Sequence, residues 1–165
     1  GITLRGVLEC PAAGPSEKRH IAEAVAAANG ALSWRGRLAG ATKESFFADI
    51  DLFVFPTTYR TEAYPLVLVE ALVRGVPVIA LDRGCICDLA PLASCTIVQD
   101  PADFAEAAMG LLRGWLDNPG AIAAASHVAL ADGLALYAAN RAARDALVDQ
   151  LITAAGGNGQ ELDRR

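Results

Sequence analysis

Short apolar segments of strand length recur along the chain, and helical patterns separate them. The expected strands cover residues 2–8, 32–35, 52–55, 78–81 and 96–98. The expected helices between them cover residues 16–29, 43–49, 65–74 and 86–90. Strands that alternate with helices in this order predict an α/β fold, in which a Rossmann-like parallel sheet is flanked by helices.

The sequence after the fifth expected strand reads as helical. An amphipathic helix is expected over residues 101–116, and the sequence Asn-Pro-Gly at 118–120 closes it. Residues 121–155 are alanine-rich and helical, with a break expected at Asp132-Gly133. The chain thus ends in a helical region, followed at residues 156–165 by a segment expected to be a flexible tail.

The clearest local pattern is a strand–helix–strand unit within residues 51–82. Residues 52–55 form a continuous apolar run, which is typical of a strand covered on both faces. Pro65 suits the first position of the next helix, where its missing N–H is not needed, and Gly75 suits the helix end. Residues 78–81 form the second strand, so the unit predicts a right-handed, parallel connection.

Two glutamates eight positions apart, Glu62 and Glu70, bracket the loop-to-helix junction of this unit. Glu70 stands in an otherwise apolar run, where a carboxylate loses hydration, so we expect it to face a ligand. Ligands of open parallel sheets bind beyond the carboxyl ends of the strands, where the loop 56–64 lies. The first N–H groups of the helix suit a phosphate, whereas carboxylates suit sugar hydroxyls. The segment therefore predicts a ligand with a diphosphate and two polyol parts, as in a nucleotide sugar.

Residues 62–70, with the sequence EAYPLVLVE, closely resemble the E-x7-E signature of family 4 retaining glycosyltransferases, which have the GT-B fold. The matching positions on either side are Phe46, Phe47, Asp51 and residues 71–84, and weaker agreement covers most of residues 1–118. The resemblance implies a C-terminal, donor-binding domain. Such an enzyme transfers a sugar from a nucleotide-diphosphate sugar to an acceptor with retention of anomeric configuration.

The resemblance also implies roles for individual residues. Glu62 would face the transferred sugar as the catalytic residue, and Glu70 would accept hydrogen bonds from the ribose hydroxyls. Backbone amides of the turn would lie against the diphosphate, and Pro65 has no N–H to give. The expected donor-binding residues are Glu70, Ala63, Tyr64, Pro65, Leu66, Val67, Leu38 and Lys43, with the amides of Leu66 and Val67 as the phosphate contacts.

Some of these residues have other interpretations. Leu38 and Lys43 lie in a loop that matches the base-binding region of the family, but a surface loop without a role is the alternative. Thr42 in this loop is expected to cap the following helix. Glu62 could instead be an acidic residue that stabilises the helix N-terminus. Tyr64 could instead be an ordinary core residue.

Two parts of such an enzyme are missing from the sequence: the first strand with its basic loop, expected before Ile2, and the N-terminal domain that binds the acceptor glycan, lipid or small molecule. We therefore expect a fragment that transfers no sugar alone. In the family's sheet order the missing strand lies between residues 2–8 and 52–55, so the isolated chain should expose strand edges and show low solubility or self-association. The alternatives are a nucleotide-binding or interaction module without transferase activity and half of a GT-B-like sugar-nucleotide epimerase.

The composition limits other functions. The chain has 165 residues, 53% of them hydrophobic, and a net charge of −5, which fits one globular domain over residues 1–155. This acidic balance argues against nucleic-acid binding by a basic face. Uninterrupted apolar runs fall short of the ~20 residues of a membrane span, so no transmembrane segment is expected. We expect a cytoplasmic protein. The full protein could also make peripheral contact with the inner face of the membrane.

No metal or other cofactor is expected besides the nucleotide-sugar substrate. The D-x-D sequence at 49–51 precedes the strand 52–55 and so lies at the wrong end of the sheet for a ligand. His20, His127 and Asp88 lack partners with catalytic spacing and are expected at the surface. The cysteines lack zinc-site spacing and are expected to be reduced thiols: Cys10, Cys85, Cys87 and Cys95.

Overall fold

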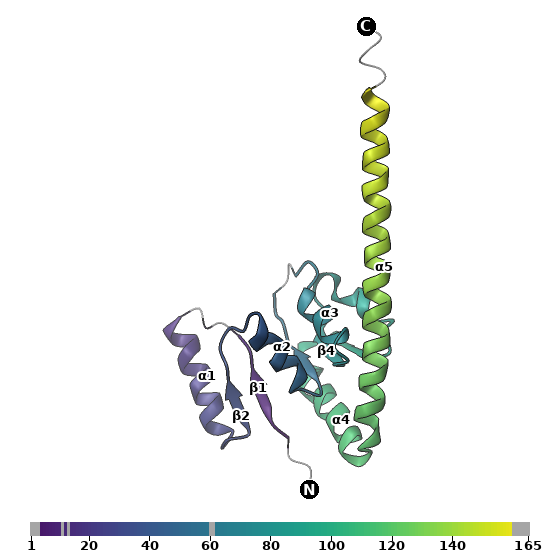
Figure 1. The fold of residues 1–165 in the computed structure, drawn as a ribbon. Helices are drawn as coiled ribbons and strands as arrows, with labels where there is room; N and C mark the ends of the chain where they lie inside the picture. Colours follow the sequence, from purple (N-terminus) through teal and green to yellow (C-terminus); the bar gives the residue numbers. More distant parts are fainter. Residues whose placement is uncertain (1–3, 11, 13, 60–61, 160–165) are drawn as a thin grey trace. The chain divides into compact units, whose positions relative to one another are not determined.

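The computed structural model describes residues 4–10, 12, 14–59 and 62–159, and the chain divides into two compact units, Gly1–Asp49 and Ile50–Arg165. Figure 1 shows the elements of both units. In the first unit they are β1 (Gly6–Leu8), α1 (Pro15–Ala27), β2 (Leu32–Trp34) and α2 (Ala41–Ala48). In the second unit they are β3 (Phe53–Phe55), α3 (Leu66–Leu72), β4 (Val78–Leu81), the 3₁₀ helix η1 (Gly84–Leu89), β5 (Cys95–Val98), the 3₁₀ helix η2 (Pro101–Asp103), α4 (Phe104–Asp117) and α5 (Gly120–Gly159). The described strands pair in parallel throughout, which confirms the predicted α/β class.

The first unit is a β–α–β–α segment. β1 and β2 are parallel neighbours, with Gly6 opposite Leu32 and Leu8 opposite Trp34, and α1 packs on β2. The Trp34 indole N–H donates to the carbonyl oxygen of Cys10 at 3.0 Å, which ties the segment after β1 to the end of β2. Both predicted strands are present. β1 begins later than predicted, at Gly6, and residues 2–3 of the predicted strand lie outside the described residues.

The start of α2 differs from the prediction. Gly40 is the N-cap residue, so the expectation that Thr42 caps this helix is wrong. The cap position has φ +54°, a conformation that glycine adopts without steric cost. Thr42 instead lies in the first turn, where its hydroxyl donates to the carbonyl oxygen of Ala39 at 2.8 Å and accepts the Ala39 N–H at 3.3 Å.

The second unit contains a three-stranded sheet in the order β3–β4–β5. β4 is buried along its whole length, as a central parallel strand should be. β3 is different: Phe53 is buried but Val54 is 44% exposed, so the prediction of a strand covered on both faces is wrong there. Because β3 is an edge strand of the described sheet, fewer elements pack over its outer face.

One hydrophobic cluster supports the sheet of the second unit. Ile79 and Leu81 on β4 pack with Val98 on β5 and with Phe104 at the start of α4. On α3, Leu68 and Leu72 are fully buried. The helix α4 begins one turn later than predicted, because residues 101–103 form the 3₁₀ turn η2 before it.

The helix α3 lies where the sequence predicted it, but Pro65 is its N-cap rather than its first residue. The proline ring restricts φ alone, and at ψ 100° the Pro65 carbonyl accepts the Leu68 N–H at 3.0 Å. Gly75 ends the helix as predicted. Its φ is +74°, and the N–H groups of Gly75 and Val76 donate to the carbonyls of Leu72 and Ala71 at 2.9 and 3.0 Å.

The helix α5 is continuous, so the expected break at Asp132-Gly133 is wrong. Both residues are contact points: a Cβ at Gly133 would lie 2.5 Å from the Leu72 carbonyl carbon, and Asp132 Oδ2 accepts hydrogen bonds from the N–H and hydroxyl of Ser94 at 3.0 and 2.6 Å. The helix also includes residues 156–159, which the sequence had placed in a flexible tail. The rest of that predicted tail, 160–165, lies outside the described residues.

By length and composition, α5 could cross a membrane. The stretch Gly120–Ala155 has 36 residues, and an 18-residue window within it has a mean hydropathy of 1.4. Length and composition alone do not make α5 a membrane span, so the expectation that the chain has no transmembrane segment stays a prediction. In Figure 1 the second half of α5 extends past α3 and the sheet of its own unit.

Candidate functional site

The predicted donor-binding segment lies directly after the carboxyl end of β3. The structure describes residues 56–59 and 62–65 of the loop between β3 and α3, and α3 carries Leu66, Val67 and Glu70. Leu66 is 70% exposed, whereas Pro65 is buried. Because Leu68 is the first residue whose N–H bonds within this turn, the N–H groups of Leu66 and Val67 precede the helical hydrogen bonds.

Gly84 brings a second loop onto this segment. It follows β4 and has φ +57°, and a Cβ built on it would lie 1.5 Å from the carbonyl oxygen of Glu62. The next residue, Cys85, donates its N–H to the carbonyl oxygen of Ala63 at 3.2 Å. The backbones of two loops, each at the carboxyl end of a parallel strand, are therefore in direct contact at Glu62 and Ala63.

The Glu70 side chain is half-buried, and its Oε2 atom is shielded from solvent. Its backbone carbonyl accepts a hydrogen bond from the Arg74 guanidinium at 2.8 Å, one turn further along. A shielded carboxylate oxygen on the first two turns of a helix is a strong acceptor for hydroxyl groups. The structure thus shows that Glu70 is partly desolvated, and its role toward a ligand stays a prediction.

Tyr64 is half-buried, which is compatible with both interpretations made from the sequence: a donor-binding residue and an ordinary core residue. Burial raises the pKa of the Tyr64 phenol, and hydrogen bonding by the Asn140 side chain opposes that rise. The phenol is therefore a neutral hydrogen-bonding group near pH 7.

In the first unit, the predicted base-binding loop is held by a residue that the sequence did not single out. Glu9 follows β1, and its Oε1 accepts the N–H of Leu38 at 3.0 Å. Leu38 and Lys43 are both half-buried. Because β1 and β2 are parallel, Glu9 and the loop after β2 lie at the same edge of their sheet, the edge where ligands bind.

Other candidates have ordinary structural environments. Asp49 of the D-x-D sequence is paired with Arg35 Nη1 at 3.3 Å, and His20, His127 and Asp88 are exposed, as predicted. The four cysteines are free thiols. Burial raises the pKa of Cys95 to about 11. Desolvation and the nearby carboxylates of Asp88 and Asp82 raise the pKa of the Cys87 thiol, which disfavours a reactive thiolate.

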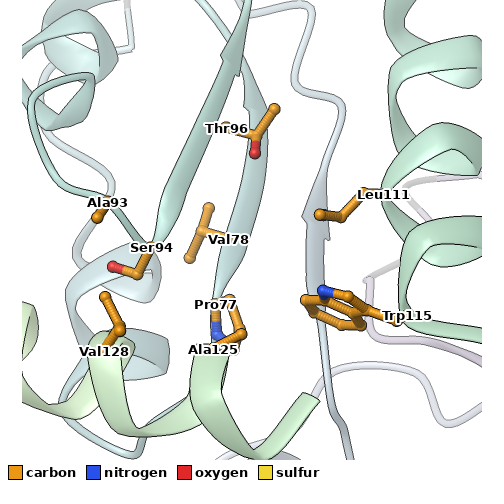
Figure 2. Close-up of a pocket in the computed structure, with 9 residues that line it drawn as sticks. All are labelled: Pro77, Val78, Ala93, Ser94, Thr96, Leu111, Trp115, Ala125 and Val128. Atoms are coloured by element: carbon orange, nitrogen blue, oxygen red, sulfur yellow. The ribbon is translucent and has the colours of Figure 1, made fainter. Parts of the chain in front are cut away.

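A small cavity of about 230 Å³ lies at the opposite end of the same sheet (Figure 2). It is lined by Val78 at the start of β4, by Ser94 and Thr96 around β5, and by Trp115 of α4 and Val128 of α5. This is the amino end of the strands, where parallel sheets rarely bind ligands. The cavity is therefore separate from the segment that carries Glu62 and Glu70.

Two contributing residues were not assigned a role from the sequence: Glu9 and Gly84. Gly84 had a local signal, because Asp-Arg-Gly directly follows a buried strand. Glu9 had none, because its partner Leu38 is 29 positions away in the sequence.

Comparison with known proteins identifies the class. The family described as glycosyl transferases group 1 matches residues 7–114, and the chain belongs to that family. The match includes both Glu62 and Glu70. No curated protein matches the chain by sequence.

Solved glycosyltransferases of the GT-B type share the fold. Sucrose-phosphate synthase from Thermosynechococcus elongatus is 23% identical, with a TM-score of 0.65, over 90% of this chain and 38% of that one. Anabaena HepE in complex with UDP is 17% identical, with a TM-score of 0.67, over 88% of this chain and 41% of that one. HepE in complex with UDP and glucose gives a TM-score of 0.64 at 17% identity, over 87% and 40% of the two chains. The chain thus spans about two-fifths of the length of these proteins.

Proposed function

We propose that this chain is the donor-binding domain of a retaining glycosyltransferase of the family 4 type, and that it binds a nucleotide-diphosphate sugar. The observation that carries the proposal is the placement of Glu62 and Glu70. Both lie on the loop and helix that follow the carboxyl end of β3, inside the region that the family match covers. The complex of HepE with UDP and glucose supports a nucleotide sugar as the ligand class.

In this proposal each group has a separate task. Glu70 accepts hydrogen bonds from the ribose hydroxyls, and the N–H groups of Leu66 and Val67 contact the diphosphate. Glu62 faces the transferred sugar. The amides and charges of the protein then stabilise the departing diphosphate. Because these groups are already in position, they stabilise the developing negative charge without having to reorient.

Two of the remaining predicted contacts, Leu38 and Lys43, belong to the first unit. Leu38 would pack on the nucleotide base and Lys43 would reach it, with Glu9 fixing the backbone of their loop through the Leu38 N–H. Ala63, Tyr64 and Pro65 would shape the turn before Leu66. The acceptor, whether glycan, lipid or small molecule, would bind to a domain outside this chain, and we propose a cytoplasmic location.

The test is a turnover assay on the protein at its full natural length, with UDP-, GDP-, ADP- and dTDP-sugars and a set of sugar, lipid and small-molecule acceptors. Release of nucleoside diphosphate together with a new glycosidic bond of unchanged anomeric configuration, read by NMR, is expected. An inverted product would reject retention. An epimerised donor would favour the epimerase alternative, and nucleotide binding without turnover would favour a binding module.

A further inference from the structure

Two consecutive residues at the carboxyl end of β1 hold the loop that follows β2. The Leu8 carbonyl oxygen accepts the Arg35 N–H at 3.0 Å, directly beyond the last paired residues of the two strands. The Oε1 atom of Glu9 accepts the Leu38 N–H, also at 3.0 Å. The backbone of one residue and the side chain of the next therefore fix two points of the loop, three positions apart.

The bond to Leu38 differs from its neighbours in the loop because its acceptor is a charged side chain. Arg35 donates to a backbone carbonyl, and Ala39 donates its N–H to the Thr42 hydroxyl at 3.3 Å. A hydrogen bond to a carboxylate is roughly twice as strong as one between neutral groups. Glu9 and Leu38 are both half-buried, so removal of the carboxylate would take this acceptor from a partly desolvated N–H.

This bond lies at the edge of the sheet where a ligand is expected. β1 and β2 are parallel, so their carboxyl ends meet at the edge where ligands of parallel sheets bind. In the proposed function Leu38 packs on the nucleotide base, and Lys43, in the first turn of α2, reaches it. Glu9 bonds directly to the backbone of one of these two residues, so the place of the base contact depends on it.

We propose that Glu9 is a positioning residue for the nucleotide base: its carboxylate fixes the backbone of Leu38 and so sets where the Leu38 side chain meets the base. This inference rests on the proposed function. It assigns Glu9 to base selectivity, whereas Glu70 is assigned to the ribose. It also gives the loop after β2 a role, in place of the alternative of a surface loop without one.

The experiment measures the binding of UDP, GDP, ADP and dTDP by calorimetry in full-length variants of Glu9. Glu9→Asp keeps the charge but shortens the side chain by one methylene, which withdraws the carboxylate from the Leu38 N–H. It should raise the Kd of the preferred diphosphate about 3- to 10-fold and the other Kd values less, so that base preference narrows. Glu9→Gln keeps the length and an acceptor oxygen, so its Kd values should stay within about 2-fold of the wild type.

A double-mutant cycle with Leu38→Ala tests whether Glu9 acts through Leu38. This substitution removes the side chain that meets the base but keeps the backbone N–H that Glu9 holds. The double variant with Glu9→Asp should bind the preferred diphosphate no more weakly than the weaker single variant, because both changes remove the same base contact. Multiplicative effects of the two changes would overturn the inference.

Glu23→Asp is the matched control, since Glu23 is an exposed glutamate on α1 of the same unit. It should leave all four Kd values unchanged. An equal rise of the four Kd values in Glu9→Asp would show a merely structural contact and overturn the inference. A lower melting temperature with unaltered Kd values would overturn it too. A wild type that binds none of the four diphosphates would instead reject the proposed function itself.

Discussion

The carbonyl oxygen of Glu62 lies where a side chain at residue 84 would begin: a Cβ on Gly84 would be 1.5 Å from it. Gly84 also has φ +57°, which costs other residues roughly 1–2 kcal/mol. This contact joins the loop after β3 to the loop after β4. It makes the position of Glu62 depend on a residue that carries no functional group.

Gly84→Ala should therefore displace the loop that carries Glu62. We expect a loss of about 2–4 kcal/mol in unfolding free energy, the sum of the conformational cost and the steric overlap, and a large drop in the rate of sugar transfer. Denaturant unfolding and the transfer assay measure these two effects. Gly110→Ala on α4 is the control, because a Cβ there meets no atom within 4 Å. Wild-type turnover in Gly84→Ala would show that the loop contact does not support the site.

Gly133→Ala tests whether α5 is docked on α3. In an exposed helix, alanine in place of glycine would stabilise by about 1 kcal/mol. Here the added methyl would overlap the Leu72–Val73 backbone, so a destabilisation of roughly 1–3 kcal/mol is expected instead. Gly114→Ala, at an open position of α4, should show the propensity effect alone. An increase in unfolding free energy in both variants would contradict the docking.

Glu62→Ala should separate catalysis from nucleotide affinity, because its proposed contact is with the transferred sugar. The turnover number should fall by roughly 10²-fold, as for other groups that stabilise a transition state. The Kd for the nucleoside diphosphate should stay within a few-fold of the wild type. Parallel loss of both quantities would indicate that Glu62 holds the turn after β3 instead.

Transfer should not require a divalent ion. Asp49 of the D-x-D sequence is paired with Arg35, and both carboxylates of that sequence precede β3 rather than follow it. Activity in excess EDTA should equal that of the untreated protein. Loss of activity in the chelator, with recovery on added Mg²⁺ or Mn²⁺, would reject this prediction.

The sequence was sufficient for the order of elements because buried strands and helix ends have local signals. The apolar run of β4 and the stop at Gly75 depend on neighbouring residues, and both predictions are confirmed. Pro65 was misplaced by one position, because the proline ring fixes φ and leaves ψ to the tertiary structure. Val54 was misjudged because an apolar run does not reveal whether its strand is central or at an edge.

The errors on α5 and in the site have another origin. Asp132-Gly133 has the composition of a helix break, yet Gly133 is needed where α3 approaches, and Asp132 binds Ser94. Only the folded chain shows such contacts. Likewise, Glu70 could be selected from its apolar neighbours, whereas the hydrogen bond between Glu9 and the Leu38 N–H, 29 positions away, has no local signal.

The central claim is that Glu70 binds the ribose of a nucleotide-diphosphate sugar, and calorimetry with a nucleoside diphosphate on the full-length protein tests it most directly. Charge-assisted hydrogen bonds contribute roughly 1.5–3 kcal/mol, so Glu70→Ala should weaken binding about ten- to a hundred-fold. Glu70→Gln should recover part of that loss, and Glu106→Ala, an exposed glutamate on α4, should change nothing. Wild-type affinity in a folded Glu70→Ala protein would contradict the account.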